Sequence, residues 1–284
     1  MKRNIFIHQI YYSKETQSKL DQGFIPLDNT ENKRPDWREY WCIKSFFIKN
    51  KIIDENYYGF FSPKLFEKTG LTSINIFNFI NQNDNNIDIF LFNPIKKSSF
   101  IFFNVIDQAI NKHETKLYDT FKKIFSIINK DKFNITNLVN HSDNTVYSNY
   151  FVAKGSFWKE WLKINEFLFN DLESNNSNFQ DVLTKEVNYS NKKVQLKVFI
   201  VERVASIILA CVPDIKRLSY NIFKMPNFRN TSFFSKNYFL FLDYLKINYG
   251  KNNNQIYKIL FLLTSLNIFN LSMFISCVFR KRSN

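Results

Sequence analysis

Short apolar runs alternate along the chain with longer stretches in which apolar side chains recur every three or four positions. The short runs are rich in β-branched and aromatic residues and predict buried strands at 5–10, 56–61, 87–92 and 147–153. The longer stretches predict helices at 37–50, 71–82, 102–111, 117–128, 156–172 and 198–210. Strands that alternate with helices predict an α/β fold with a mostly parallel sheet flanked by helices.

The pattern changes after residue 212. Residues 216–236 are basic and irregular, and residues 259–279 then run without a charge up to the basic triplet at 280–282. We therefore expect a globular domain over 1–212 and a basic, apolar helical extension over 213–284.

Two asparagines, Asn267 and Asn270, stand in the uncharged run and disfavour a helix that spans a membrane. The run predicts instead a helix in the membrane surface, with Arg280, Lys281 and Arg282 on anionic headgroups. The alternative is a helix that packs on the domain or on a partner subunit.

Charge and composition narrow the function classes. The 284 residues carry a formal net charge of +14, which attracts polyanions such as nucleic acid, anionic lipid or nucleotide phosphates. The basic residues are scattered and form no nucleic-acid-binding motif, so a dedicated nucleic-acid binder is not expected.

Cysteine usage and the first residues bear on the compartment. Cys42, Cys211 and Cys277 are far apart and odd in number, which argues against a disulfide scaffold or a thiolate zinc site. The apolar run near the N-terminus is too short for a signal peptide. The domain over 1–212 is therefore expected in the cytoplasm, with peripheral contact to the inner face of the cytoplasmic membrane.

The passage from the second strand into its loop is a candidate ligand site, because ligands of open α/β sheets bind beyond the carboxyl ends of strands. Gly59, next to Tyr58, would allow a ligand close to the backbone, and Ser62 and Lys64 would contact phosphate. The alternative is a buried strand that ends in an ordinary proline turn.

Charged residues on the helices suggest further chemistry. Asp36 precedes the first long helix and caps it, contacts a ribose or base, or acts as a general base on a hydroxyl group, while Arg38 offers a planar fork for a diphosphate. Glu202 stands beside Arg203 in an apolar helix, where it either forms a structural ion pair or acts as a general base on a hydroxyl group. Thr72 or Ser73 is expected to cap the helix at 71–82.

Aromatic and amide side chains around the strand at 147–153 suit a sugar. Asn149 and Tyr150 could bind hydroxyl groups, and Trp158, on a different helical face from Phe157 and Trp161, is the better candidate for packing on a sugar ring. Core packing is the alternative for all of these rings.

Eight blocks in one order resemble GT-A-like glycosyltransferases of bacterial capsule, exopolysaccharide and lipopolysaccharide biosynthesis, and are similar in layout to the capsular polysaccharide synthesis domain family. They cover roughly residues 4–211. The blocks are IHQIYYS, GFIPLDN, RPDWREYWCIKSFF, YYGFFSPKLFEKTG, IDIFLFNP, VIDQAINKHE, VYSNYFVAKGSFWKEWL and KVFIVERVASIIL.

The resemblance implies a Rossmann-like fold, a nucleotide-sugar donor, a growing glycan or lipid-linked acceptor and a site role for His113. It also implies Mn²⁺ or Mg²⁺ held by an Asp-x-Asp pair after the central strand. The chain departs from that pattern, because its acidic stretch at 84–88 precedes a strand. Lys64 and Lys68 would then neutralise the diphosphate, with the donor near Gln9. The alternative is a non-catalytic assembly protein on a transferase scaffold.

Overall fold

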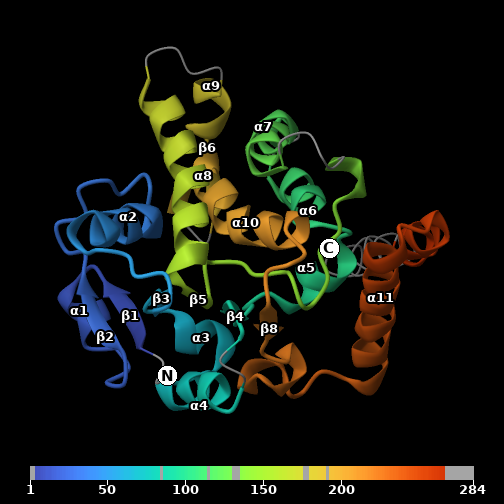
Figure 1. The fold of residues 1–284 in the computed structure, drawn as a ribbon, viewed down its shortest axis with the longest axis horizontal. Helices are drawn as coiled ribbons and strands as arrows, with labels where there is room; N and C mark the ends of the chain where they lie inside the picture. The colour runs from blue at the N-terminus through green and yellow to red at the C-terminus, as the bar shows by residue number, and fades with distance from the viewer. Residues whose placement is uncertain are drawn as a thin grey trace, which may run out of the picture.

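The computed structural model describes residues 4–83, 86–113, 116–129, 135–174, 179–189 and 192–265. Within these ranges, six strands form one mixed sheet in the order β2-β1-β3-β5-β4-β8 (Figure 1). These strands are β1 (Ile5–Tyr11), β2 (Ile25–Asp28), β3 (Tyr57–Phe61), β4 (Ile89–Leu91), β5 (Phe151–Lys154) and β8 (Arg217–Ser219). A separate hairpin consists of β6 (Glu186–Tyr189) and β7 (Lys192–Gln195).

The α-helices over the same ranges connect and cover these strands. They are α1 (Lys14–Gln17), α2 (Glu39–Lys49), α3 (Leu65–Thr69), α4 (Ser73–Asn81), α5 (Lys96–Ile101), α6 (Val105–Lys112), α7 (Leu117–Asn129), α8 (Gly155–Glu173), α9 (Gln180–Leu183), α10 (Leu196–Cys211) and α11 (Phe233–Asn252). Short 3₁₀ turns are η1 (Ile135–Asn137), η2 (Ile222–Lys224) and η3 (Pro226–Phe228). Figure 1 places α1 and β2 at the left end of the molecule and α11 at the right end.

Five of the six strands run in the same direction. β1 pairs in parallel with β2 and β3, and β4 with β8, whereas β5 lies antiparallel between β3 and β4. The carboxyl ends of the five parallel strands and the start of β5 therefore meet at one edge, which we call the carboxyl edge. The α/β class and the mostly parallel sheet flanked by helices are confirmed.

Helices cover both faces of the sheet because neighbouring residues of a strand point to opposite sides. Phe60 of β3 contacts Phe46 of α2 and Trp158 of α8, each with ring centroids 5.1 Å apart. On the other face, Phe79 of α4 contacts Phe92, which follows β4, at 5.8 Å. Aromatic rings thus pack on both faces of the sheet, alongside the more numerous aliphatic side chains of the core, which explains part of the high phenylalanine content.

The predicted strands at 5–10, 56–61, 87–92 and 147–153 are present as β1, β3, β4 and β5, and the predicted helices are present as α2, α4, α6, α7, α8 and α10. The side chain of Thr72 accepts a hydrogen bond from the Asn75 backbone N–H, so the predicted cap of α4 is confirmed. The short strands β2 and β8 and the β6–β7 hairpin were not predicted, whereas α11 lies within the helical extension predicted over 213–284.

Residues beyond 212 contribute both to the six-stranded sheet and to a second hydrophobic core. β8 pairs with β4, so the sheet continues past the boundary that the sequence predicts at residue 212. α11 and a following helix over 255–265 pack on a second, smaller core that contains Phe103, Val139, Leu242 and Phe261. None of the helices in the described part of the chain combines the length and hydropathy that crossing a bilayer requires. Residues 266–279 of the predicted surface helix lie outside the described residues.

The buried side chain of His8 makes the fold sensitive to acid. Its ring packs on Phe46 and Phe60 with centroid distances of 4.6 and 5.4 Å, and its Nδ1 has no hydrogen-bond partner in the described part of the chain. Burial lowers the pKa of His8 to about 4, from 6.5 in an unfolded chain. Between these two values the unfolded state binds more protons, so stability is lost as the pH falls from about 6.5 towards 4.

We therefore expect His8→Phe to reduce the acid sensitivity of the protein. The wild-type free energy of unfolding should fall by up to about 2 kcal/mol from His8 alone between pH 7.5 and 5.0, and the variant should lack this contribution. Urea unfolding at both pH values measures the difference. His113 and His141, whose pKa values burial also lowers, titrate in both proteins and serve as the internal reference. An equal loss in variant and wild type would contradict the assignment.

Candidate functional site

Buried hydrogen bonds fasten the carboxyl edge where β1, β3 and β5 meet. The hydroxyl groups of Ser62, just after β3, and Tyr150, just before β5, are 2.5 Å apart. The Gln9 amide donates to the Ser62 carbonyl oxygen at 3.4 Å and accepts from the Asp21 backbone N–H at 2.8 Å. Gln9, Ser62 and Tyr150 are all buried, so they form the floor of this edge.

Two consecutive residues at this edge adopt a backbone conformation that side chains disfavour. Ser148 and Asn149 have φ angles of +59° and +54°, in the left-handed region. Lys68 of α3 donates to the Ser148 hydroxyl at 3.1 Å, and its Nζ lies 5.3 Å from the centre of the Tyr150 ring. Asn149 is 4% exposed, and its Oδ1 has no hydrogen-bond partner among the residues that the structure describes. Such strain and unmet hydrogen-bonding capacity are concentrated at functional sites.

Helix α10 brings a carboxyl group to the same edge. Burial raises the pKa of Glu202 above its usual value, and the charge of Glu39 raises it further. Lys68, Arg203 and Arg38 act on Glu202 in the opposite direction. Within the described part of the chain, the Glu202 carboxyl makes no hydrogen bond or ion pair, and the residue keeps part of its surface exposed. Glu202 is therefore a carboxyl that holds a proton more readily than an ordinary glutamate does, as a general base requires.

Arg203 does not form the structural ion pair with Glu202 that the sequence left open. Its Nε donates to Gln108 Oε1 at 3.1 Å, and its terminal nitrogens donate to the same oxygen and to the Phe199 carbonyl. The two neighbours on α10 therefore have separate roles: Arg203 fastens α10 to α6, and Glu202 remains unpaired.

The charges around Glu202 also act on two tyrosines. Burial raises the pKa of Tyr189, at the end of β6, and Glu202, Arg38 and Glu39 all act on its hydroxyl. Burial also raises the pKa of Tyr12, just after β1, and Glu39 and Arg38 are again neighbours. We call Glu202, the charged residues that act on it from other segments and the two tyrosines that the same charges affect the Glu202 cluster. It consists of Tyr12, Arg38, Glu39, Lys68, Tyr189 and Glu202.

Sequence reasoning found Arg38, Lys68 and Glu202 of this cluster and missed the others. Tyr12 is the second residue after the first predicted strand, so its position was a usable signal. Tyr189 lies on the β6–β7 hairpin, whose polar sequence gives no strand pattern. Lys64 is exposed on the surface and is not among the charges that act on Glu202.

His113 and Asp36 have surroundings of their own. The His113 ring stacks on Phe199 with centroids 3.8 Å apart, and burial lowers its pKa to about 4, with Arg203 adding to the effect. His113 is therefore neutral at physiological pH. The Asp36 carboxylate pairs with Arg34 at 2.9 Å and with Lys197 at 2.5 Å.

The predicted helix cap at Asp36 is wrong. Helix α2 begins at Glu39, and its N-cap residue is Arg38, whose φ is +48° and whose side chain makes no capping bond. The two ion pairs hold Asp36 between the preceding loop and α10 instead. These pairs occupy the carboxylate, so Asp36 is a poorer candidate base than Glu202.

Three residues that were predicted to contact a ligand, Trp158, Tyr58 and Gly59, lie inside the core. Trp158 is completely buried, and its indole N–H donates to the Tyr58 carbonyl at 2.9 Å, so the prediction of an exposed sugar-binding ring is wrong. Tyr58 is also buried. Gly59 is central in β3, where a Cβ atom would come within 2.8 Å of the Val152 side chain. Packing between β3 and β5, rather than approach of a ligand, requires glycine there.

The acidic stretch before β4 lies away from the carboxyl edge. Asp88 pairs with Lys154 at 2.9 Å and accepts from the Lys216 backbone N–H, at the amino end of β4. Asp84 is outside the described residues. Among the residues that the structure describes, no three His, Cys, Asp or Glu side chains gather as a metal site would require.

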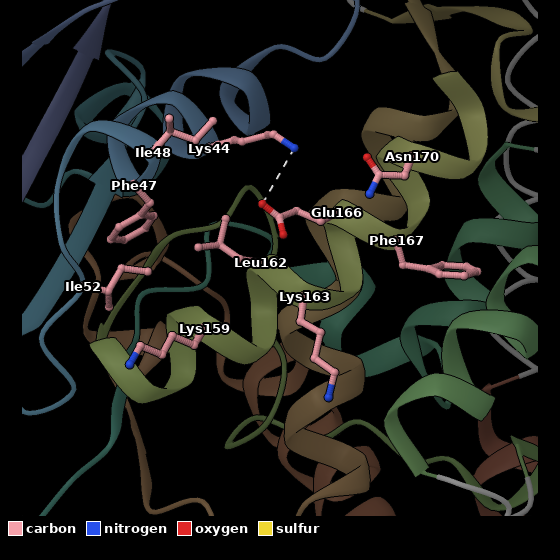
Figure 2. Close-up of a pocket in the computed structure, with 10 residues that line it drawn as sticks. All are labelled: Lys44, Phe47, Ile48, Ile52, Lys159, Leu162, Lys163, Glu166, Phe167 and Asn170. Atoms are coloured by element: carbon pink, nitrogen blue, oxygen red, sulfur yellow. Dashed lines mark ion pairs between the residues drawn. The ribbon is translucent and has the colours of Figure 1, made fainter. Parts of the chain in front are cut away.

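A groove of about 540 Å³ lies between α2 and α8, away from the Glu202 cluster. Figure 2 shows Lys44 of α2 pointing towards Glu166 of α8 across it, with Nζ and Oε1 3.7 Å apart. Apolar side chains such as Phe47, Ile52 and Leu162 line its left side in this view. None of the predicted site residues lines this groove, so it is a separate surface feature.

No family model, curated protein or solved structure matches the chain. The choice of function therefore depends on the Glu202 cluster and on the ordered sequence blocks.

Proposed function

We propose that the chain is a GT-A-like glycosyltransferase, which moves a sugar from a nucleotide-sugar donor to a growing surface glycan or a lipid-linked acceptor. The observation that carries the proposal is Glu202, a carboxyl of raised pKa that has no hydrogen bond or ion pair among the described residues and on which the charges of Lys68 and Arg38 act. The mostly parallel sheet is consistent with the Rossmann-like fold that the sequence resemblance implies. Ligands of such sheets bind at the carboxyl edge, where this cluster lies.

The chemistry follows from the charges of the cluster. Glu202 takes the proton of the acceptor hydroxyl as its oxygen attacks the anomeric carbon of the donor. The bond from that carbon to the diphosphate oxygen breaks, and the nucleoside diphosphate leaves with the electron pair. Lys68 and Arg38 stabilise the negative charge that develops on the leaving group, and Arg38 can hold two phosphate oxygens at once.

The Mn²⁺ or Mg²⁺ ion that the resemblance implies finds no suitable ligand set among the described residues. Asp88 is committed to Lys154 and Lys216 at the other end of β4. No step of the proposed transfer is therefore routed through a metal, and the cationic side chains carry the diphosphate charge.

A thermal-shift panel with UDP, GDP, CMP and dTDP species, each with and without Mn²⁺, identifies the nucleotide. We expect one of them to stabilise the protein and Lys68→Gln to weaken its affinity about tenfold or more, since hydrogen bonds to charged groups contribute 1.5–3 kcal/mol. Lys64→Gln is the matched control, because Lys64 is exposed in the same segment, and it should change affinity less than about twofold.

Product formation from the matching nucleotide sugar separates catalysis from scaffolding. The lack of an Asp-x-Asp pair after the central strand favours the alternative, a non-catalytic, membrane-peripheral assembly protein on a transferase scaffold. Nucleotide binding without any transfer would support that alternative. No stabilisation by any nucleotide would overturn both the donor site and the transferase proposal.

A further inference from the structure

The positive charge of the chain is concentrated in its last quarter. Residues 215–284 contain eleven lysines and arginines and one acidic residue, Asp243, so they carry +10 of the total formal charge of +14. In the structure Asp243 is buried, and its Oδ1 accepts from the Ser142 backbone N–H at 2.8 Å. Over 215–265, the exposed charges are therefore all basic, and they include Arg229, Lys236 and Lys251.

An apolar stripe runs along the helix over 255–265, and among the described residues no side chain covers it. Ile256, Ile259, Leu260 and Leu263 follow the i, i+3, i+4, i+7 spacing of one helical face and are between 43% and 61% exposed. The opposite face carries Phe261, which is buried in the second core. A helix with one packed face and one fully apolar exposed face requires a partner for the second.

Helix α11 presents a second apolar face beside this stripe. Phe233, Leu240 and Tyr244 are exposed at spacings of seven and four residues, and Lys251 continues the same face. The two helices contact each other, because the Tyr238 hydroxyl of α11 donates to the Thr264 carbonyl at 3.2 Å. We call α11 and residues 255–265 the C-terminal hairpin. In Figure 1, α11 stands at the end of the molecule opposite α1 and β2.

The charges on the C-terminal hairpin indicate which kind of partner binds this surface. A second copy of the hairpin would bring cations against cations, since no acidic side chain is exposed on it. An anionic bilayer complements both features: its headgroups attract the lysines, and its interfacial region accepts the aromatic and aliphatic side chains. We propose that the C-terminal hairpin is a docking surface for anionic phospholipid membranes. This proposal does not depend on the transferase activity.

Sedimentation of the full chain with lipid vesicles tests the apolar part of the surface. The protein should bind vesicles of equal parts phosphatidylglycerol and phosphatidylcholine, and bind pure phosphatidylcholine at least tenfold more weakly. The double variant Ile259→Gln, Leu263→Gln should lose at least tenfold in affinity. Ile48→Gln, Ile74→Gln is the matched control, because those side chains are 68% and 69% exposed elsewhere. The control should bind as the wild type does.

Charge variants test the electrostatic part. Lys236→Gln, Lys251→Gln should weaken binding roughly fivefold for each lysine removed, whereas Lys33→Gln, Lys193→Gln, with the same change in net charge, should have little effect. Circular dichroism verifies that each variant is folded. Equal binding to neutral vesicles, or undiminished binding by the Ile259 and Leu263 variant, overturns the proposal. A dimer in analytical ultracentrifugation that this variant dissociates, without vesicle binding by the wild type, assigns the face to a second copy instead.

Discussion

Replacing Glu202 by glutamine is expected to lower the turnover number for sugar transfer by a factor of about 10² to 10⁴, the range that a general base contributes. Glutamine has nearly the same shape but cannot take the proton of the acceptor hydroxyl. The Michaelis constant for the donor should change little, because Lys68 and Arg38 remain in place. Initial rates of product formation with saturating donor and acceptor measure the effect.

The same variant should be more stable than the wild type at alkaline pH. Because burial raises the folded-state pKa of Glu202, the folded protein binds a proton that the unfolded chain releases. Its stability contribution is complete below the unfolded pKa and is lost as the pH rises through the folded value. Glu202→Gln removes this loss, which amounts to about 1.4 kcal/mol for each unit by which the folded pKa exceeds the unfolded one.

Glu166→Gln is the control for both measurements, since Glu166 lies in the groove between α2 and α8 rather than in the Glu202 cluster. It should leave both the rate of transfer and the pH dependence of stability unchanged. Full activity of the Glu202→Gln protein would show that another group activates the acceptor. Loss of stability at pH 8 would show that the carboxylate is paired and structural.

Trp158→Ala is expected to destabilise the protein by about 3–5 kcal/mol, the usual cost of removing a large buried aromatic side chain. The ring packs on Phe151 and Phe60 with centroids 4.6 and 5.1 Å away, between α8 and the sheet. The substitution leaves a cavity there and also removes the donor to the Tyr58 carbonyl. Urea unfolding followed by circular dichroism measures the change.

Trp41→Ala provides the comparison, because Trp41 is only half-buried on α2 and should cost markedly less. The outcome also decides between two roles for Trp158. If this ring bound the acceptor sugar, the variant would keep its stability and lose affinity for the acceptor. A stable Trp158→Ala protein would therefore contradict the buried packing.

Local sequence signals predicted the strands and helices whose buried, apolar positions recur at regular spacing along the element. The continuous apolar run of β3 indicated a strand buried on both faces, and the apolar spacing of α8 indicated a helix packed along one side. Thr72 capped α4 as predicted, because the bond that it makes is with Asn75, three residues away. β8 was not predicted because it is only three residues long and is an edge strand, which pairs with a neighbouring strand on one side alone.

The candidate site depended on contacts that the sequence does not encode locally. Asp36 was expected to cap a neighbouring helix, but Lys197, far along the chain, pairs with it instead. Glu202 was expected either to pair with Arg203 or to act as a general base. The fold decided between these because it places Gln108 of α6 where its side-chain oxygen accepts a hydrogen bond from Arg203.

By itself the sequence determined the α/β class, the main strands and helices, and a set of residues from which Glu202, Lys68 and Arg38 could be chosen. Only the tertiary structure decided which of those residues meet at the carboxyl edge and which, like Trp158, are enclosed in the core. The physical reason is the range of the forces involved. Periodicity and capping act over a few residues, whereas burial and the field at a carboxyl group depend on chain segments that only folding brings together.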